Sequence, residues 1–286
     1  MSSNMIRRVS VAAVAIPTAI FVVHIGGWAL SGLLSVFAAL GTAEVYKLAE
    51  RAGVRPLKEL GYIGAALIPV AVFAATADGL GLGYRYLPFA VPVFLMAVMA
   101  HAVSSRPPDE KPLTAVSITV FAVLYTSGLL AFLILLRHPP APLSAWGATW
   151  LVFLPLTVVW ICDSAAMTFG SMIGGPKFAP VVSPNKTWSG TIAGSLSGGI
   201  VAPVYFLIFL DRFSFDLSLP QLVVFGLVVS SVGQIGDLAE SLFKREVGTK
   251  DSGTFFPGHG GILDRFDSLY WAIPTAVILL GLYGVI

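Results

Sequence analysis

Charged side chains are scarce in this chain. Only 11% of its 286 residues are Asp, Glu, Lys or Arg, whereas 56% are hydrophobic. A water-soluble domain carries about 25% charged residues, so this chain has too few charges to cover a water-facing surface. The composition excludes a soluble globular protein and indicates that lipid is the main solvent. The length suits a single membrane domain over residues 1–286.

Cysteine and net charge are also nearly absent. The single cysteine, Cys162, excludes an intramolecular disulfide, and its apolar neighbours favour a packing role over a reactive thiol. No group of Cys and His has the spacing of a zinc site. The formal net charge of +2 is too small to indicate nucleic acid as a partner.

Long apolar runs make up most of the chain. A membrane helix needs about 20 mostly apolar residues, and in this setting helices satisfy the backbone without leaving an open edge. We therefore expect an all-α, polytopic integral membrane protein with about nine transmembrane helices. The expected spans centre on residues 9–24, 28–46, 60–77, 86–103, 113–136, 147–170, 188–210, 220–240 and 267–286.

The first apolar run has a second interpretation. Arg7 and Arg8 precede a stretch of small apolar residues, as in a cleaved signal peptide. We favour a retained helix, because the cleavage-like residues 11–15 come before a full apolar core.

The basic residues are divided unevenly between the two sides of a nine-span chain. One side receives 14 of the 17 Lys and Arg residues, and the other receives Arg85, Arg137 and Arg212. The positive-inside rule places the larger set in the cytoplasm. We expect a bacterial-type inner (plasma) membrane protein with a cytoplasmic N-terminus and the C-terminus on the far side. An eight-span chain would lose this asymmetry.

One polar segment, residues 241–267, interrupts the apolar pattern, and we call it the signature segment. Its glycines allow close approach of backbone N–H groups to a ligand. Its basic side chains suit phosphate, and its carboxylates suit a hard cation such as Mg²⁺. These features predict a cytoplasmic nucleotide–metal site rather than a plain solvated loop. The charged residues and histidine are Lys244, Arg245, Glu246, Lys250, Asp251, His259, Asp264, Arg265 and Asp267.

Polar residues also occur between residues 160 and 190. Asp163 lies inside an expected span, where a carboxylate is costly and therefore a functional candidate, although a structural ion pair would also explain it. Thr187 is placed to cap the next helix, and a helix N-terminus that carries Lys186 suits an anionic phosphate. A plain helix start with a snorkelling lysine explains the same two residues equally well.

The end of the span at 220–240 carries a polar stripe. Asp237, Glu240, Ser241 and Lys244 follow i, i+3, i+4, i+7 spacing, which places them on one helix face. The alternative is a helix end that simply reaches water. Asp264 and Asp267 are three residues apart where the last span begins, so they can also share a face.

Small residues recur with Gly-x-x-x-Gly spacing at residues 170–174, 190–194 and 194–198. This spacing predicts close helix packing, either within one subunit or between subunits. A homodimer is therefore left open.

The order of motifs in the signature segment is specific. It contains S-x-x-K-R, K-D, P-G-H-G-G and D-R-x-D in turn, and S-P-x-K-T precedes it at residues 183–187. This order resembles that of the CDP-diacylglycerol synthases, also called phosphatidate cytidylyltransferases. The resemblance covers most of residues 160–267, within the C-terminal helices at 147–286. Residues 1–140 show only generic hydrophobicity.

The resemblance implies a membrane enzyme of phospholipid biosynthesis that converts CTP and phosphatidate into CDP-diacylglycerol and pyrophosphate. It also implies Mg²⁺ as the cofactor, with K⁺ as a candidate second ion and membrane lipids as the surroundings. Asp237 and Asp264 are then the expected metal ligands, with Asp163, Asp251 and Asp267 as second candidates. The residues expected at substrate are Lys186, Thr187, Ser241, Lys244, Arg245, Lys250, His259, Gly260, Gly261 and Arg265. Within these sets, Asp237, Lys250, Asp251, Asp264 and Arg265 form the expected catalytic group.

Two other function classes are weaker. A CDP-alcohol phosphatidyltransferase would carry an Asp-x-x-Asp-Gly-x-x-Ala-Arg pattern, which is missing here. A transporter of ions or lipids could use the intramembrane carboxylates, but no inverted repeat is evident in the sequence.

Overall fold

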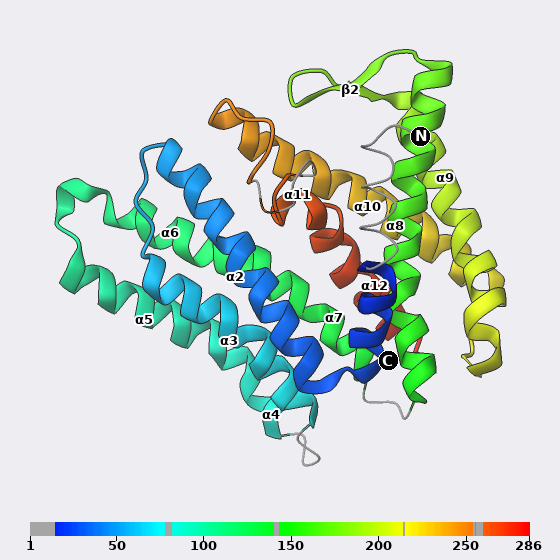
Figure 1. Ribbon diagram of the computed structural model, residues 1–286, viewed down its shortest axis with the longest axis horizontal. Coiled ribbons are helices and arrows are strands. Elements are labelled where there is room, and N and C mark those ends of the chain that lie inside the picture. Colours follow the sequence, from blue (N-terminus) through cyan, green and yellow to red (C-terminus); the bar gives the residue numbers. More distant parts are fainter. Residues whose placement is uncertain (1–14, 78–81, 140–142, 214, 254, 256–259) are drawn as a thin grey trace.

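The computed structural model describes residues 15–77, 82–139, 143–213, 215–253, 255 and 260–286, which form a bundle of helices with one short hairpin (Figure 1). The N-terminal helices are Ala15–Ile25, α2 (Gly27–Arg51), α3 (Lys58–Ala77), α4 (Leu82–Tyr86), α5 (Ala90–Ser105), α6 (Pro112–Val123) and α7 (Leu129–Arg137). The C-terminal elements are α8 (Ala145–Ile173), β1 (Lys177–Ala179), β2 (Ser183–Thr187), α9 (Trp188–Tyr205), α10 (Leu219–Glu246), α11 (Leu263–Phe266) and α12 (Leu269–Leu282). Short 3₁₀ or π segments extend several helices: η1 (Leu87–Phe89), η2 (Pro108–Glu110), η3 (Leu124–Gly128), η4 (Phe206–Leu210) and η5 (Asp211–Phe213).

The expected all-α membrane architecture is confirmed, but within the described part of the chain fewer helices than expected are long enough to cross a bilayer. Among the described residues, seven helices have the necessary length and apolar composition. The first expected span, of which residues 9–14 lie outside the described part, is the short helix Ala15–Ile25. The last is α12, whose 14 residues extend about 21 Å, less than the roughly 30 Å of a hydrocarbon core. The seven are Gly27–Arg51, Lys58–Ala77, Leu87–Ser105, Pro112–Arg137, Ala145–Ile173, Trp188–Phe213 and Leu219–Glu246.

Local capping signals set the ends of the C-terminal helices. The Ser144 hydroxyl accepts a hydrogen bond from the Gly147 amide at 3.1 Å and begins α8. Gly174, at φ +66°, ends α8 in a conformation that suits glycine. The predicted cap at Thr187 is confirmed, because its hydroxyl accepts from the Gly190 amide at 3.2 Å. Each signal is local, which is why these helix ends are readable from sequence.

The hairpin between α8 and α9 was not expected. Strands β1 and β2 pair antiparallel, with Lys177 opposite Thr187 and Ala179 opposite Ser183. In Figure 1 the hairpin lies at the upper end of the bundle, where the C-terminal end of α10, α11 and the turn from α2 to α3 also lie. The hairpin brings β2, and with it Lys186, to the end of the bundle that carries the signature segment.

Close helix crossings hold α8, α9 and α10 together. A methyl group on Gly190 would lie 2.6 Å from the Ala166 carbonyl oxygen of α8. A methyl group on Gly194 would lie 3.0 Å from the sulfur of Cys162, which is buried. The Gly-x-x-x-Gly prediction is therefore confirmed for packing within the chain.

Replacing Gly198 with alanine should destabilise this bundle by about 1–3 kcal/mol, because overpacking a tight crossing forces the backbones apart. The new methyl would lie 2.5 Å from the Gly226 carbonyl oxygen of α10. The matched control is Gly32→Ala on α2, where nothing lies within 4 Å of the added atom. Thermal unfolding in detergent measures both variants. A Gly198→Ala protein that melts with the wild type would contradict the close crossing.

Helix α12 lies in the centre of the molecule. Its Tyr270, Ile273 and Leu280 side chains are fully buried, and the helix contacts α7, α8 and α10. Figure 1 shows α12 (red) between the N-terminal helices and α8. The helix therefore joins the two parts of the chain behind the signature segment.

Candidate active site

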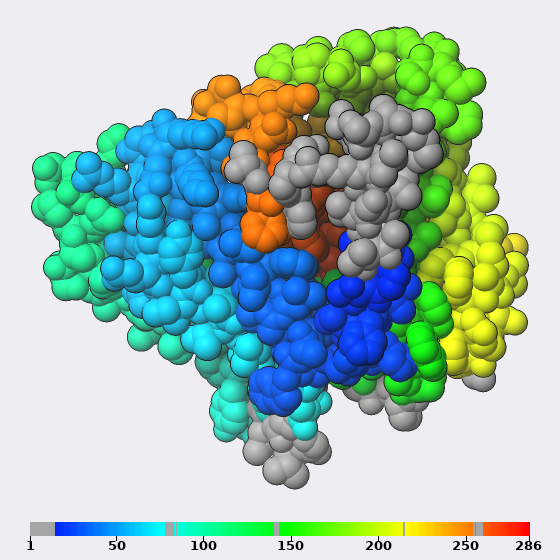
Figure 2. All heavy atoms as spheres, viewed as in Figure 1, coloured from blue at the N-terminus to red at the C-terminus, as the bar shows by residue number. Residues whose placement is uncertain are grey.

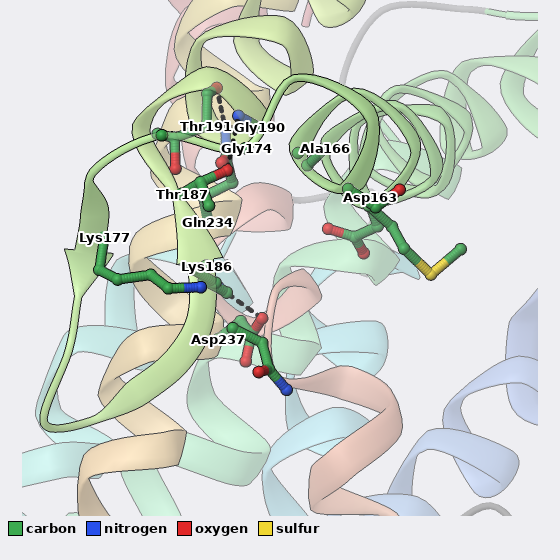
Figure 3. A pocket seen from close by; sticks show the side chains of 15 residues that line it. Asp163, Ala166, Gly174, Lys177, Lys186, Thr187, Gly190, Thr191, Gln234 and Asp237 are labelled. Atoms are coloured by element: carbon green, nitrogen blue, oxygen red, sulfur yellow. Dashed lines mark hydrogen bonds and ion pairs between the residues drawn. The ribbon is translucent and has the colours of Figure 1, made fainter.

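A pocket of about 670 Å³ opens between α8, the hairpin, α9 and α10 (Figure 3). Both signs of charge line it: the carboxylates of Asp163 and Asp237 and the amines of Lys177 and Lys186. Figure 3 shows Lys177 reaching from β1 toward Lys186 and Asp237. The remaining lining residues are Ala166, Met167, Gly170, Ser171, Gly174, Gly175, Asn185, Thr187, Gly190, Thr191 and Gln234.

Lys186 and Asp237 form the ion pair at the centre of this pocket. The Lys186 Nζ lies 2.6 Å from Asp237 Oδ2 and joins β2 to α10. The Ser241 hydroxyl, one turn further along α10, donates to Asp237 Oδ1 at 3.3 Å. The predicted stripe on α10 is therefore present, and its first member faces the pocket.

Three carboxylates, two on helices and one in the turn between α11 and α12, repel one another beside this ion pair. Asp163 of α8 and Asp237 of α10 act electrostatically on each other, and both act on Asp267, just before α12. Asp267 Oδ1 also accepts a hydrogen bond from the Ser268 amide at 2.6 Å. We call Asp163, Lys186, Asp237 and Asp267 the pocket cluster. Its carboxylates outnumber its lysine, so the cluster favours an additional cation.

A second group, the loop cluster, consists of Glu240, Lys244, Ser252 and Asp264. The Lys244 ammonium donates to Asp264 Oδ1 at 2.8 Å and forms an ion pair with Glu240 one turn earlier on α10. Glu240 is completely buried and Lys244 nearly so. Two carboxylates therefore share one buried ammonium, and this shared lysine ties α10 to the start of α11.

Asp264 accepts hydrogen bonds through both of its oxygens. Lys244 donates to Oδ1. The other oxygen, Oδ2, accepts from the Gly261 amide at 2.7 Å and the Ser252 amide at 3.0 Å, and it lies 2.9 Å from the Ser252 hydroxyl oxygen. Burial alone would raise the pKa of Asp264, but Lys244 and these amides outweigh burial and hold the pKa below its usual range. Gly260, at φ +83°, packs against the same carboxylate and leaves no room for a side chain. Asp264 is therefore an ionised anchor of the signature segment.

The other candidate residues lie further from these contacts. The Arg245 guanidinium donates to the carbonyl oxygens of Val182 in the hairpin and Thr249 at 3.1 and 2.7 Å. Lys250, Asp251 and Arg265 are exposed. His259 lies outside the described residues. The structure thus joins the predicted residues into two adjacent clusters along α10, with several basic groups facing solvent around them.

Sequence reasoning missed Glu44, a buried carboxylate on α2 that contacts the signature segment. It lies inside the expected span at 28–46, so the argument that singled out Asp163 applied to it equally. Residues 1–140 therefore contribute a polar contact as well as hydrophobic packing. The pocket residues Lys177 and Gln234 were also not selected, and the pattern offered no signal for either.

The pocket cluster has the donor chemistry for Mg²⁺. Among the described residues, no group of three or more His, Cys, Asp or Glu side chains is arranged to hold a metal alone. Mg²⁺, however, is usually bound by one or two carboxylates together with substrate phosphates and water. Asp163 and Asp237 meet that requirement, because both border the open pocket. Asp264 would have to exchange one of its present donors to bind a cation.

Comparison with known proteins gives the family. A protein of Staphylococcus saprophyticus named phosphatidate cytidylyltransferase is 45% identical over 129 residues, which cover 45% of this chain and 48% of the relative. Equally named proteins of Staphylococcus aureus and Rickettsia bellii are 48% and 42% identical, over 43% and 47% of this chain and 46% and 59% of theirs. The chain thus spans about half the length of the curated relatives it matches. The model of the Cytidylyltransferase family matches residues 6–283, so the chain belongs to this family.

Proposed function

We propose that this protein transfers a cytidylyl group from CTP to phosphatidate and releases CDP-diacylglycerol and pyrophosphate. The observation that carries the proposal is the pocket itself, in which two lysines and two carboxylates from α8, β1, β2 and α10 border one open cavity at the end of a membrane bundle. Membership of the Cytidylyltransferase family supports it. The names of the relatives supply the lipid substrate.

The chemistry requires charge neutralisation more than an activated nucleophile. The phosphate monoester of phosphatidate is mostly dianionic near neutral pH, because its second pKa is about 6. One of its oxygens attacks the α-phosphorus of CTP, a new P–O bond forms, and the bond to the β-phosphate breaks with its electrons on pyrophosphate. No Ser–His–Asp arrangement is needed. The barrier is the meeting of two anions, which Lys177 and Lys186 would lower by binding phosphate oxygens in the pocket.

We assign Mg²⁺ to Asp163 and Asp237, with Asp267 and Asp264 as nearby carboxylates. When bound, Mg²⁺ would polarise the phosphates and stabilise the charge of pyrophosphate as it leaves. K⁺ is proposed as a second ion, and replacing KCl with NaCl in the assay tests it. The chain's own lysines and backbone donors hold the carboxylates in orientation.

The proposed orientation places the hairpin end of the bundle in the cytoplasm, where CTP is found. The basic residues of the α2–α3 turn, the hairpin and the signature segment gather at this end, in agreement with the positive-inside rule. Phosphatidate would enter from the adjacent leaflet and keep its acyl chains in lipid. A homodimer stays a proposal, because the described glycine crossings are used within the chain. Cross-linking in intact membranes tests it.

The experiment is reconstitution of the purified chain in lipid nanodiscs with CTP, phosphatidate and Mg²⁺. The expected result is CDP-diacylglycerol, identified by mass spectrometry, together with an equal amount of pyrophosphate. Controls omit CTP, omit phosphatidate, or replace phosphatidate with diacylglycerol, which lacks the attacking phosphate. If folded protein forms no CDP-diacylglycerol under conditions that support a related enzyme, the proposed function is wrong.

Replacing Lys186 with methionine should lower kcat/KM for CTP on the order of 100-fold. The substitution keeps most of the side-chain volume but removes the ammonium beside Asp237. It also leaves the repulsion among the carboxylates of the pocket cluster without its nearest counter-charge. The control is Lys47→Met on the exposed face of α2, which should retain wild-type kinetics. A Lys186→Met enzyme with unchanged kcat/KM would remove Lys186 from the site.

A further inference from the structure

Glu44 is a buried carboxylate that binds the signature segment from the N-terminal part of the chain. It lies on α2, and only 5% of its surface is exposed. Its Oε1 accepts from the Ile262 amide at 3.0 Å, and its Oε2 accepts from the Leu263 amide at 2.8 Å. These two amides begin α11, where backbone N–H groups have no partner within their own helix. Glu44 supplies the acceptors from another helix.

The signature segment is shaped around this carboxylate. A methyl group on Gly253 or Gly261 would collide with the carboxylate oxygens of Glu44, so the missing side chains allow this close approach. Figure 2 shows the residues near 250 (orange) lodged beside α2 (blue), below the hairpin (light green). The fit explains two glycines of the segment by steric contact with α2 rather than by contact with substrate.

One hydroxyl connects Glu44 to the candidate catalytic carboxylate. The Ser252 Oγ lies 2.8 Å from Glu44 Oε2 and 2.9 Å from Asp264 Oδ2. The Gly261 amide donates to Asp264 next to the residues that Glu44 holds. A shift of Glu44 therefore moves two donors of Asp264 together, and through Asp264 it also affects Lys244.

We propose that Glu44 is a positioning residue that fixes Ser252 and the start of α11, so that Asp264 and Lys244 keep the orientation needed for phosphate transfer. The carboxylate is placed at a membrane helix, where it is costly, and donors of the signature segment satisfy it. An apolar side chain at this position would leave the Ile262 and Leu263 amides buried without acceptors. The effect on turnover rests on the proposed function, whereas the effect on the segment does not.

Hydrogen exchange tests the positioning role without substrate. In Glu44→Gln the side-chain volume is kept, but one acceptor becomes an NH₂ group that faces a donor. We expect the amides of residues 260–266 to exchange at least ~10-fold faster than in the wild type, because a lost hydrogen bond to a charged group eases local opening. The control is Thr42→Val: Thr42 lies on α2 like Glu44, but its buried hydrogen bond is to Thr126 of η3 and not to the signature segment. Exchange in α8 checks that each variant is folded.

Enzyme kinetics provide a second test of the positioning role of Glu44. In Glu44→Gln, kcat should fall roughly 10-fold with KM for CTP and phosphatidate little changed, since orientation in the transition state is lost rather than binding. Glu44→Asp keeps the charge and should recover part of both the exchange protection and kcat. The inference is overturned if Glu44→Gln exchanges within about twofold of wild type, or if Thr42→Val loosens the segment equally. If the wild type makes no CDP-diacylglycerol, the proposed function fails while the exchange result still decides the role of Glu44.

Discussion

Replacing Asp264 with asparagine should lower the rate of CDP-diacylglycerol formation on the order of 1,000-fold. The wild-type carboxylate accepts from Lys244, from the Gly261 amide and from the Ser252 amide. An asparagine has one acceptor oxygen, so its NH₂ group must face either the Lys244 ammonium or the backbone amides. The low pKa of Asp264 keeps it ionised at neutral pH, and the substitution removes that charge.

The measurement is the initial rate per folded protein in nanodiscs. Asp109→Asn, on the exposed η2 turn, is the control and should retain wild-type activity. A folded Asp264→Asn protein with a near wild-type rate would refute any catalytic role for this carboxylate. A loss of rate that is fully accounted for by a loss of thermal stability would instead identify Asp264 as a structural anchor alone.

Replacing Lys244 with methionine should cost about 3–5 kcal/mol of unfolding free energy, because it leaves two buried carboxylates without their shared cation. Glu240 is fully buried, and the side chain of Asp264 is 7% exposed. Repulsion between these carboxylates would also loosen α11 from α10. Turnover should also be lost, either because the protein unfolds or because α11 no longer contacts α10.

Thermal unfolding in detergent measures the loss, with Lys58→Met as the control. Lys58 pairs with Glu50 at 2.6 Å, but both side chains are well exposed, so that pair should contribute at most about 1 kcal/mol. Removing the charge of Glu240 as well, in Glu240→Gln with Lys244→Met, should restore part of the stability. An unchanged melting temperature in Lys244→Met would show that the buried ion pairs are not needed for the fold.

The patterns that predicted this protein correctly are local ones. Helical spacing placed Asp237, Ser241 and Lys244 on one face of α10, and the Ser241 hydroxyl indeed donates to Asp237. The Thr187 cap follows from contacts within three residues along the chain. Helix α10 continues past the apolar run at 220–240, through the predicted polar stripe that ends at Lys244, and stops at Glu246. A membrane helix need not end where its apolar run ends, because its polar turns can continue into water.

The assignments that failed or were missed depend on partners far apart in sequence. Glu44 and Ile262 are 218 residues apart, and the local sequence around either residue does not indicate that they are in contact. The hairpin also cannot be recognised from the hydrophobic pattern of the sequence, because its strands are only three and five residues long. Arg245 donates to backbone carbonyls of the hairpin and of the segment, and its expected role at phosphate stays a prediction.

By itself, the sequence determined that this chain is a helical membrane protein with one polar segment and a set of phosphate-type and metal-type side chains. Hydrophobic run length and helical spacing are sufficient for this, because they report how single segments meet lipid and water. Only the tertiary structure decided how those side chains are paired. It placed Lys186 on Asp237, Lys244 between Glu240 and Asp264, and Glu44 under the start of α11. Pairing depends on how helices cross, and close crossings at glycines such as Gly190, which borders the pocket, set those distances.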